Sequence, residues 1–412
     1  MKIYNSNIRP MSKITLLFAW VIIAASCNKE LPGATPAIYP PVNNSTTSIG
    51  TLINTDSTYS FFKAAATKAG MLDQLSDTTK LFTVFLPDNA AFRASGIPSI
   101  DVVNALPETA LGGIVGYSII PGKQFSGPEI PTAFPNIQLP SSITIGALPG
   151  TAVALKLSTF PSTRPNGIWD NNIPVLVPDV KLQNGVIHVV AGIVAPPSQL
   201  LRDAIYSDPN LTYFKAAVAR ADSGQRDSLN KLNYLLGYAF TNMTVLVPTD
   251  TAFRSLLFKN IYGALLLKGY PQPTALTTAQ ALSASPDVFS NPVLFDVLTA
   301  ATVKGIIAYH FLATNAGAGF QPNIRAFSVN FASSPTFYTT LVNTALAIHP
   351  GINAQATFLS TVPIVTNLQF TGYGTFPPGG MPYSGTPAKA ISMDHHAVNG
   401  VYHIIDRVLL PQ

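Results

Sequence analysis

The stretch that decides the fold is TVFLPDNAAFR, residues 83–93, and it returns later in the chain as TVLVPTDTAFR, residues 244–254. Each copy opens with a short run of β-branched and apolar residues, which predicts a buried strand. We expect the strands to end at Pro87 and Pro248, because proline has no amide hydrogen to donate to a neighbouring strand.

A helix is predicted directly after each proline. A polar pair stands there in both copies, and a polar side chain can accept a hydrogen bond from the unpaired amides of a first helical turn. The helix would place Phe92 in the first copy, and Phe253 in the second, on its buried side. The capping candidates are Asp88 or Asn89 in the first copy and Thr249 or Asp250 in the second.

Three further blocks recur in the same order, so the chain contains an internal duplication. The spacing between the copies grows along the chain, which places insertions in the second copy around residues 256–294 and within 309–399. We predict one domain at residues 48–197 and another at 199–412, with Pro196-Pro197 between them. The recurring blocks are YSFFKAA (59–65) and LTYFKAA (211–217), GIVGY (113–117) and GIIAY (305–309), and NGVIHVV (184–190) and NGVYHII (399–405).

Short helices and short strands are mixed within each copy. Residues 59–75 place apolar side chains near helical spacing, which predicts an amphipathic helix. The dipeptides Asn184-Gly185 and Asn399-Gly400 are typical of hairpin turns, and each leads into a strand that we expect to alternate between apolar and polar faces. The pattern predicts a β-rich α+β fold for each domain.

The composition favours packed domains outside the cytosol. Hydrophobic residues make up 47% of the 412 residues and charged residues only 10%, whereas disordered chains are polar and highly charged. Three of the five net positive charges come from Lys2, Arg9 and Lys13. The rest of the chain lacks the basic surface that nucleic-acid binding requires, so we expect no nucleic-acid partner.

The N-terminus has the pattern of an export signal that ends in a lipid-attachment site. A basic segment precedes an apolar run at residues 14–23, which is too short to span a bilayer. Small residues then precede Cys27, the one cysteine of the chain, and this resembles a lipobox, whose thiol accepts a diacylglycerol. Ala24 stands where leucine is usual. The alternative is a buried free cysteine in an uncleaved helix.

The lipobox resemblance implies a signal peptide at residues 1–26 and a tether at residues 27–47, rich in Pro, Asn, Ser and Thr, that begins at the acylated Cys27. Asn28 is not the aspartate that marks inner-membrane retention in some bacteria, and Lys29-Glu30 is similar to a surface-export signal of some lipoproteins. We therefore expect a cell-envelope protein that is anchored in the outer membrane by lipid and exposed at the cell surface.

The recurring blocks resemble the signatures of the fasciclin, or FAS1, domain. Its strand-Pro-polar-polar-x-Ala-Phe signature is matched at Val84–Phe92 and Val245–Phe253, and its Asn-Gly-Val-Ile-His signature at Asn184–Val190 and Asn399–Ile405. The resemblance covers residues 48–412 and implies two tandem domains, each a β-sandwich or wedge with packed short helices. It implies structural motif roles for Pro87, Phe92, Asn184, Gly185, His188, Pro248, Phe253, Asn399, Gly400 and His403.

Members of this family are mostly extracellular or surface proteins that mediate adhesion to proteins or carbohydrates. The resemblance therefore implies a cell-surface adhesion or ligand-binding lipoprotein that is not an enzyme and needs no cofactor or metal. The alternative is the surface glycan-capture component of a polysaccharide-uptake system. Consistent with a non-enzyme, the sequence contains no nucleophile elbow, Gly-rich phosphate loop or zinc-protease motif.

Tyr309-His310 is similar to a family segment that is associated with cell binding in some animal members, which makes both residues candidate ligand contacts. The same pair could pack in the core after a helix, since tyrosine can bury its ring while its hydroxyl keeps a polar partner. The first copy has Tyr117-Ser118 at this place, so the pair is not needed for folding in both domains.

Histidines give two further hypotheses. His188 and His403 follow the Asn-Gly turns; a catalytic role would need a nearby nucleophile and acid, whereas the family position implies bonds to neighbouring backbone. Asp394-His395-His396 is an acidic-histidine cluster. Adjacent residues point in different directions and the remaining metal ligands are not apparent, so we interpret this cluster as a solvated loop.

The run at residues 372–383 is rich in Gly and Pro and carries Tyr373, Phe376 and Tyr383. These three are candidate ligand contacts, because aromatic rings on loops can stack on sugar rings. An ordinary long surface loop is the alternative. If the loop carries specificity, removal of residues 371–385 would change binding and leave folding intact.

Overall fold

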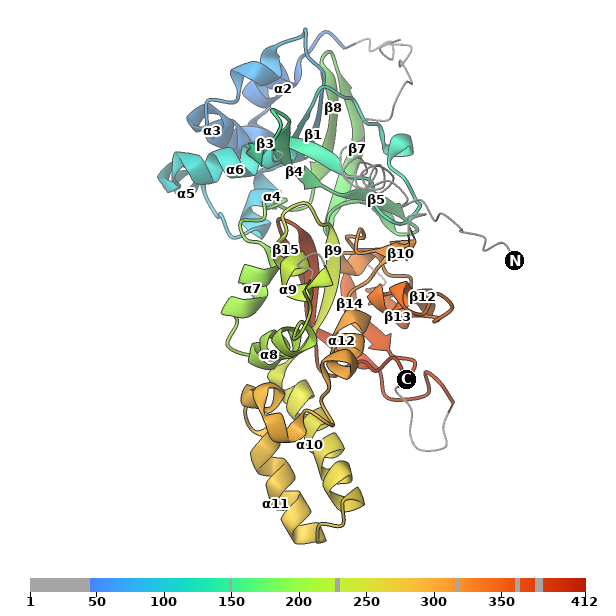
Figure 1. Cartoon of the computed structure of the whole chain (residues 1–412). Coiled ribbons are helices and arrows are strands. Elements are labelled where there is room, and N and C mark those ends of the chain that lie inside the picture. The colour runs from blue at the N-terminus through green and yellow to red at the C-terminus, as the bar shows by residue number, and fades with distance from the viewer. Residues whose placement is uncertain (1–44, 148–149, 227–229, 316–318, 360–363, 375–380) are drawn as a thin grey trace, which may run out of the picture. The chain divides into compact units, whose positions relative to one another are not determined.

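The computed structural model describes residues 45–147, 150–226, 230–315, 319–359, 364–374 and 381–412. Residues 44–412 form one compact unit, whose elements are labelled in Figure 1. The predicted signal peptide, Cys27 and most of the predicted tether lie outside the described residues. Within the described ranges, no helix combines the length and the apolar character that crossing a membrane requires.

The first repeat is built from short strands and short helices around one sheet. Its strands are β1 (Phe82–Pro87), β2 (Ile119–Pro121), β3 (Leu139–Ala147), β4 (Ala154–Thr159), β5 (Pro161–Arg164), β6 (Gly167–Asp170), β7 (Ile173–Leu182) and β8 (Gly185–Val190). Its helices are α2 (Ile49–Thr55), α3 (Ser60–Lys68), α4 (Asn89–Ala94), α5 (Ile100–Ala105) and α6 (Glu108–Ser118). The six-stranded sheet has the order β2-β1-β8-β7-β6-β5, and β3 pairs with β4 separately.

The second repeat has a sheet of the same size. Its strands are β9 (Met243–Pro248), β10 (Thr314–Asn315), β11 (Phe320–Gln321), β12 (Thr336–Tyr338), β13 (Ile352–Phe358), β14 (Val365–Thr371), β15 (Ala388–Ala397) and β16 (Gly400–Ile405). Its helices are α7 (Leu201–Ser207), α8 (Thr212–Ala221), α9 (Leu232–Gly237), α10 (Asp250–Leu267), α11 (Gln272–Ser283) and α12 (Ala300–Tyr309). The sheet has the order β12-β13-β14-β15-β16-β9, and β10 pairs with β11. Two tandem domains of an α+β fold therefore occupy the two repeats, while their exact boundaries remain predictions.

In both sheets the last strand of the repeat lies beside its first strand and parallel to it, β8 beside β1 and β16 beside β9. All four strands are buried along their whole length. In β9, Val245 and Val247 belong to the apolar cluster formed with the helices, and Leu246 belongs to a second cluster on the opposite face. The alternation of apolar and polar faces predicted for β8 and β16 is therefore wrong, because apolar layers cover both faces of these strands.

The polar pair after each proline performs two tasks. The first member caps the helix: Asp88 accepts the amide hydrogen of the third residue after it at 2.7 Å, and Thr249 does the same at 3.2 Å. The second member holds an earlier helix: Asn89 accepts an amide hydrogen from the first turn of α3, and Asp250 from the first turn of α8, both at 2.9 Å. The pair thus fixes two helices against the end of the central strand.

The helix predicted at residues 59–75 is shorter in the structure. α3 ends at Lys68, and Gly70 follows with φ +66°. This left-handed conformation is common after a helix, and glycine adopts it without steric cost. Leu75 lies in a short 3₁₀ turn instead and is still fully buried.

The insertion predicted around residues 256–294 forms a helical hairpin. α4 follows the proline of the first repeat and has six residues, whereas α10 stands at the same place and has eighteen. α11 then runs back along α10. Figure 1 shows the pair reaching beyond the other helices of the second repeat.

Candidate functional site

The asparagine of each Asn-Gly motif connects the start of its repeat to the central sheet. Asn184 accepts the amide hydrogen of Ile49 and Asn399 accepts that of Leu201, both at 2.8 Å. Each asparagine also donates to two backbone carbonyls that precede the first strand of its repeat. Both side chains are buried, so their hydrogen-bonding capacity is used inside the fold and not at the surface.

The glycine of each motif is required by close backbone packing. A Cβ atom at Gly185 would overlap the carbonyl oxygen of Phe82, and one at Gly400 would overlap that of Met243. Gly185 also has φ +155°, which L-residues with side chains rarely adopt. The two Asn-Gly motifs are therefore structural.

Both motif histidines use both ring nitrogens. Nε2 of His188 donates to the carbonyl oxygen of Phe125 at 2.8 Å, and its Nδ1 accepts from the amide of Asp179 at 3.4 Å. His403 makes the same two bonds at 2.9 and 3.3 Å, the second of them from Asp394. Burial lowers the pKa of both rings, which keeps them neutral in the tautomer that these bonds require. This is the chemistry of a structural histidine.

The aspartates that bond these histidines also correspond between the repeats. Asp179 and Asp394 both have φ +62°. The carboxylate of Asp179 accepts the amide hydrogen of Gly127 at 2.7 Å, and that of Asp394 accepts the amide hydrogen of Ser328 at 2.6 Å. Each aspartate therefore joins a bulge in its strand to a segment that is distant in the sequence.

Asp394, His395 and His396 do not form a solvated loop, and that interpretation is wrong. All three lie in β15, where bulges turn adjacent side chains toward protein. Nε2 of His395 lies 2.7 Å from the hydroxyl of Ser392, and Nε2 of His396 accepts from Arg325 at 2.9 Å. Among the described residues, no group of three or more His, Cys, Asp or Glu side chains could hold a metal ion.

Tyr309 and His310 are both fully buried. The hydroxyl of Tyr309 donates to the carbonyl oxygen of Gly351 at 2.5 Å. Nδ1 of His310 donates to the carbonyl oxygen of Ile306 at 2.8 Å, and its Nε2 accepts from the amide of Leu409 at 3.0 Å. Core packing thus accounts for both residues, and neither side chain is exposed for contact with a ligand.

Ser118 performs part of the same task in the first repeat. Its hydroxyl donates to the carbonyl oxygen of Ile114 at 2.9 Å, four residues earlier, as His310 does to Ile306. A serine is too short to extend to a second partner as the imidazole of His310 does. The histidine is therefore an additional connection to the C-terminal segment in the second repeat.

The aromatic residues near 372–383 form a cluster that is partly exposed. The rings of Tyr373 and Tyr383 meet edge to face at 5.4 Å, and that of Phe337 lies 5.1 Å from Tyr383. Phe337 is 53% exposed, whereas burial raises the pKa of Tyr383 to about 12. Phe376 lies outside the described residues. We call Phe337, Tyr373 and Tyr383 the aromatic cluster.

Much of the segment 371–385 is integrated into the second domain. The amide of Tyr373 donates to the hydroxyl of Tyr309 at 3.0 Å, and the hydroxyl of Tyr383 donates to the carbonyl oxygen of Gly351 at 2.8 Å. Thr371 is the last residue of β14. Removing the whole segment would break these bonds, so we expect the deletion to destabilise the second domain as well as to change binding.

The two repeats share a buried interface centred on Arg325, which is 4% exposed. Its guanidinium donates to Asn242, His396 and the backbone of Val398, and lies 4.3 Å from the ring of Phe160 in the first repeat. Phe160 and Trp169 belong to the same apolar cluster as the second sheet. Burial lowers the pKa of Arg325 to about 10, so the group stays charged at neutral pH.

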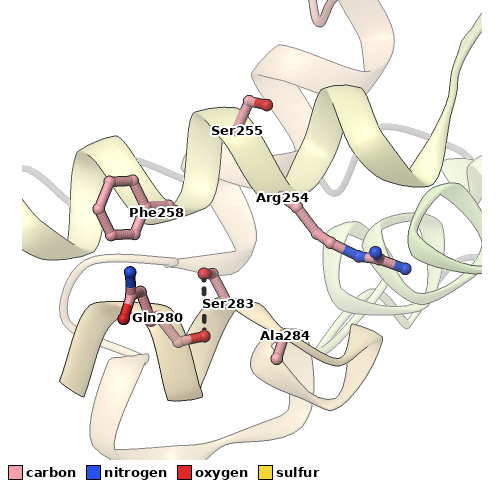
Figure 2. A pocket seen from close by; sticks show the side chains of 6 residues that line it. All are labelled: Arg254, Ser255, Phe258, Gln280, Ser283 and Ala284. Atoms are coloured by element: carbon pink, nitrogen blue, oxygen red, sulfur yellow. Dashed lines mark hydrogen bonds between the residues drawn. The ribbon is translucent and has the colours of Figure 1, made fainter. Parts of the chain in front are cut away.

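A hollow of about 430 Å³ lies between α10 and α11. Figure 2 shows Phe258 and Gln280 on opposite walls, with Arg254 at one end. The six residues around the hollow bring together one cation, an aromatic ring and amide or hydroxyl groups, and none of them is a carboxylate. They are Arg254, Ser255, Phe258, Gln280, Ser283 and Ala284.

Five important residues were not predicted from the sequence. Thr83, like Thr244 in the second repeat, accepts a backbone amide hydrogen through its hydroxyl, and its recurrence within the quoted stretch was a usable signal. Asp179 stands five residues before Asn184, as Asp394 does before Asn399, so this recurrence was also a usable signal. Arg325 and Phe337 stand outside the recurring blocks, and no pattern marked them.

Comparison with known proteins places these observations in a family. The model of the fasciclin domain matches residues 57–196. Protein sll1483 of Synechocystis is 30% identical over 142 residues, which cover 34% of this chain and 68% of that protein. A second Synechocystis protein, sll1735, is 26% identical over 140 residues, which cover 34% of this chain and 90% of that protein.

Among solved structures, a FAS1 domain pair from the insect cell adhesion molecule Fasciclin I is similar to this chain. The match covers 85% of this chain and 96% of that one, with 14% identity and a TM-score of 0.33.

Proposed function

Since the chain belongs to the fasciclin domain family, we propose that it is a non-catalytic adhesion or ligand-binding protein that its N-terminus displays at the surface of the cell envelope. Fasciclin domains are linked in general to adhesion and ligand binding. The ligand would be an extracellular protein or a carbohydrate. The two domains share a buried apolar cluster, so the ligand would meet both as parts of one compact unit.

The observation that carries this proposal is that the polar residues shared by the two repeats are used for folding, whereas a partly exposed aromatic cluster occurs in the second repeat. The asparagines, histidines and aspartates that correspond between the repeats all bond inside the fold. Ligand recognition would then rest on what the second repeat does not share with the first. The aromatic cluster is such a feature, and Phe337 presents its ring there.

Attachment would use the thiol of Cys27, acylated after removal of residues 1–26. Acyl chains contribute about 0.8 kcal/mol per buried methylene, so a multiply acylated cysteine holds a protein stably on a membrane. Cys27→Ala in the full chain, expressed in a lipoprotein-processing bacterium, should shift the protein from the membrane fraction to the soluble or unprocessed pool. Protease treatment of intact cells would then report surface display. Equal fractionation of the two forms would contradict the anchor.

The binding proposal is tested with cells that display the full chain and with the variant Phe337→Ala. We expect weaker attachment of these cells to protein-coated or polysaccharide-coated surfaces. The matched control is Leu346→Ala, which removes another exposed apolar side chain of the same domain and should leave attachment unchanged. Attachment that is the same for wild type, Phe337→Ala and cells without the protein would contradict an adhesive function.

A second candidate, surface glycan capture, is favoured by the composition of the aromatic cluster. The rings of Phe337 and Tyr373 both meet Tyr383 edge to face, and Phe337 is half-exposed; such a group of rings suits the apolar faces of sugar rings. Binding of the purified chain to a carbohydrate array, lost in Phe337→Ala and kept in Leu346→Ala, would favour glycan capture. Binding to protein-coated surfaces alone would favour adhesion.

A further inference from the structure

The α10–α11 hairpin is an addition to a fold that is complete without it. In the first repeat, α4 ends at Ala94, and the sheet and its apolar cluster close over a helix of six residues. α10 starts at the same place but is twelve residues longer, which is about three further turns, before α11 returns. Because the first repeat folds around the shorter helix, the outer half of the hairpin is not needed to bury the core.

The hairpin has its own internal packing. Ala275 and Ala279 of α11 are fully buried, and such small side chains allow two helices to approach closely. Phe258 and Tyr262 of α10 stack with parallel rings at 5.9 Å. The hairpin is therefore a defined structural element, which can hold its tip in a fixed position.

The tip of the hairpin exposes apolar side chains. Every residue from 266 to 274 is exposed. Leu267 is 91% exposed, and Leu266, Tyr270 and Leu276 are 38%, 46% and 41% exposed. Exposed apolar residues that stand singly are normal on soluble proteins, whereas a contiguous group of this kind marks a contact surface.

The charge around the tip indicates what it contacts. The sequence between Asp250 and Asp287 contains no acidic residue. It contains three basic residues, Arg254, Lys259 and Lys268. Lys268 forms an ion pair with Asp296 at 2.8 Å, with both side chains more than half exposed. Lys259 is exposed. Leucines at a tip, flanked by a tyrosine and lysines, are typical of elements that lie in the headgroup region of a bilayer.

We propose that the tip of the α10–α11 hairpin, residues 266–276, inserts its leucines and Tyr270 into the interfacial layer of a lipid bilayer that contains anionic lipid. The rings and leucine side chains would leave water, while the ammonium groups of Lys259 and Lys268 would stay at the level of the lipid phosphates. This contact does not depend on the proposed anchor at Cys27. It would set the orientation of the second domain on the membrane.

The test uses the full chain with Cys27→Ala, which removes the one natural thiol. A single cysteine is then added at Leu267→Cys and labelled with nitrobenzoxadiazole, whose emission shifts to the blue in lipid. With vesicles of phosphatidylethanolamine and phosphatidylglycerol, we expect a blue shift and quenching by doxyl groups on the acyl chains. The control label stands at Ile348→Cys, which is 90% exposed, and should not respond. Thermal unfolding checks that both labelled proteins are folded.

Two variants in the labelled chain separate the apolar contribution to lipid binding from the electrostatic one. Leu266→Ser should raise the vesicle concentration needed for half of the shift about tenfold, because one leucine no longer leaves water. Lys259→Gln should raise it about fivefold on vesicles with phosphatidylglycerol and leave it unchanged on phosphatidylcholine alone.

Equal responses at Leu267 and Ile348, or no response at Leu267, would overturn the proposal. A response at Leu267 that requires an added membrane-protein fraction and is absent with lipid alone would also overturn it, in favour of a protein partner.

Discussion

The substitution His310→Ser tests whether a buried neutral imidazole makes the second domain sensitive to acid. Serine is the residue at the corresponding place of the first repeat, Ser118, so the change fits the end of the helix. In the native protein, Nδ1 of His310 donates to Ile306 and its Nε2 accepts from the amide of Leu409. A second proton would sit on Nε2 and face that amide hydrogen, so protonation would break the bond.

The magnitude follows from the pKa. Burial lowers the pKa of His310 from 6.5 to about 4, so the unfolded chain takes up the proton first as the pH falls. The stabilisation is complete above the unfolded pKa and is lost as the pH falls from there toward the folded pKa. Between about pH 8 and about pH 5 the loss from this residue is about 2 kcal/mol.

Urea unfolding of the full chain, followed by circular dichroism, measures the effect. At about pH 8 we expect His310→Ser to be less stable by about 2–4 kcal/mol, because the amide of Leu409 loses its partner and a ring leaves the core. At about pH 5 the difference from wild type should shrink by about 2 kcal/mol. Ser118→Ala, which removes no titratable group, should show the same difference from wild type at both pH values.

Other buried histidines contribute to acid unfolding in both proteins. The diagnostic quantity is therefore the difference in free energy of unfolding between wild type and variant. A difference that is the same at the two pH values would refute the reasoning. It would mean that the ring is already protonated in the folded protein, or that the unfolded chain keeps it neutral.

Two further predictions concern the backbone and the interface. Gly185→Ala should lower the free energy of unfolding by about 3 kcal/mol or more, because the new Cβ would overlap the backbone of β1. The control is Gly70→Ala, where φ is +66° and the space is open, and it should lower that free energy by about 1 kcal/mol. Equal losses in thermal unfolding would contradict the packing argument. Arg325→Met should lower the free energy of unfolding by about 3 kcal/mol, because buried acceptors lose their donor. In calorimetry, we expect the one unfolding transition of the wild type to split into two. A single transition at the wild-type temperature would show that Arg325 does not couple the domains.

The sequence determined the parts of the fold that are local or repeated. The strand that ends at Pro87, the capping pair after it and the burial of Phe92 follow from propensities within a few residues. Recurrence of the same blocks identified two domains and placed the insertion that became the α10–α11 hairpin. A repeated pattern carries this information because both copies must satisfy the same packing.

The tertiary structure alone decided which side chains are available to a partner. Tyr309 and His310 have the composition of a binding motif, yet partners distant in the sequence, Gly351 and Leu409, hold them in the core. Asp394 to His396 look like a polar loop, yet bulges in β15 turn them into the protein. Arg325 and Phe337 carried no sequence signal, because their roles arise only when the two repeats and the long insertion pack together. Local sequence fixes backbone geometry, whereas burial is a property of the whole assembly of elements, and it is burial that separates a structural polar residue from a functional one.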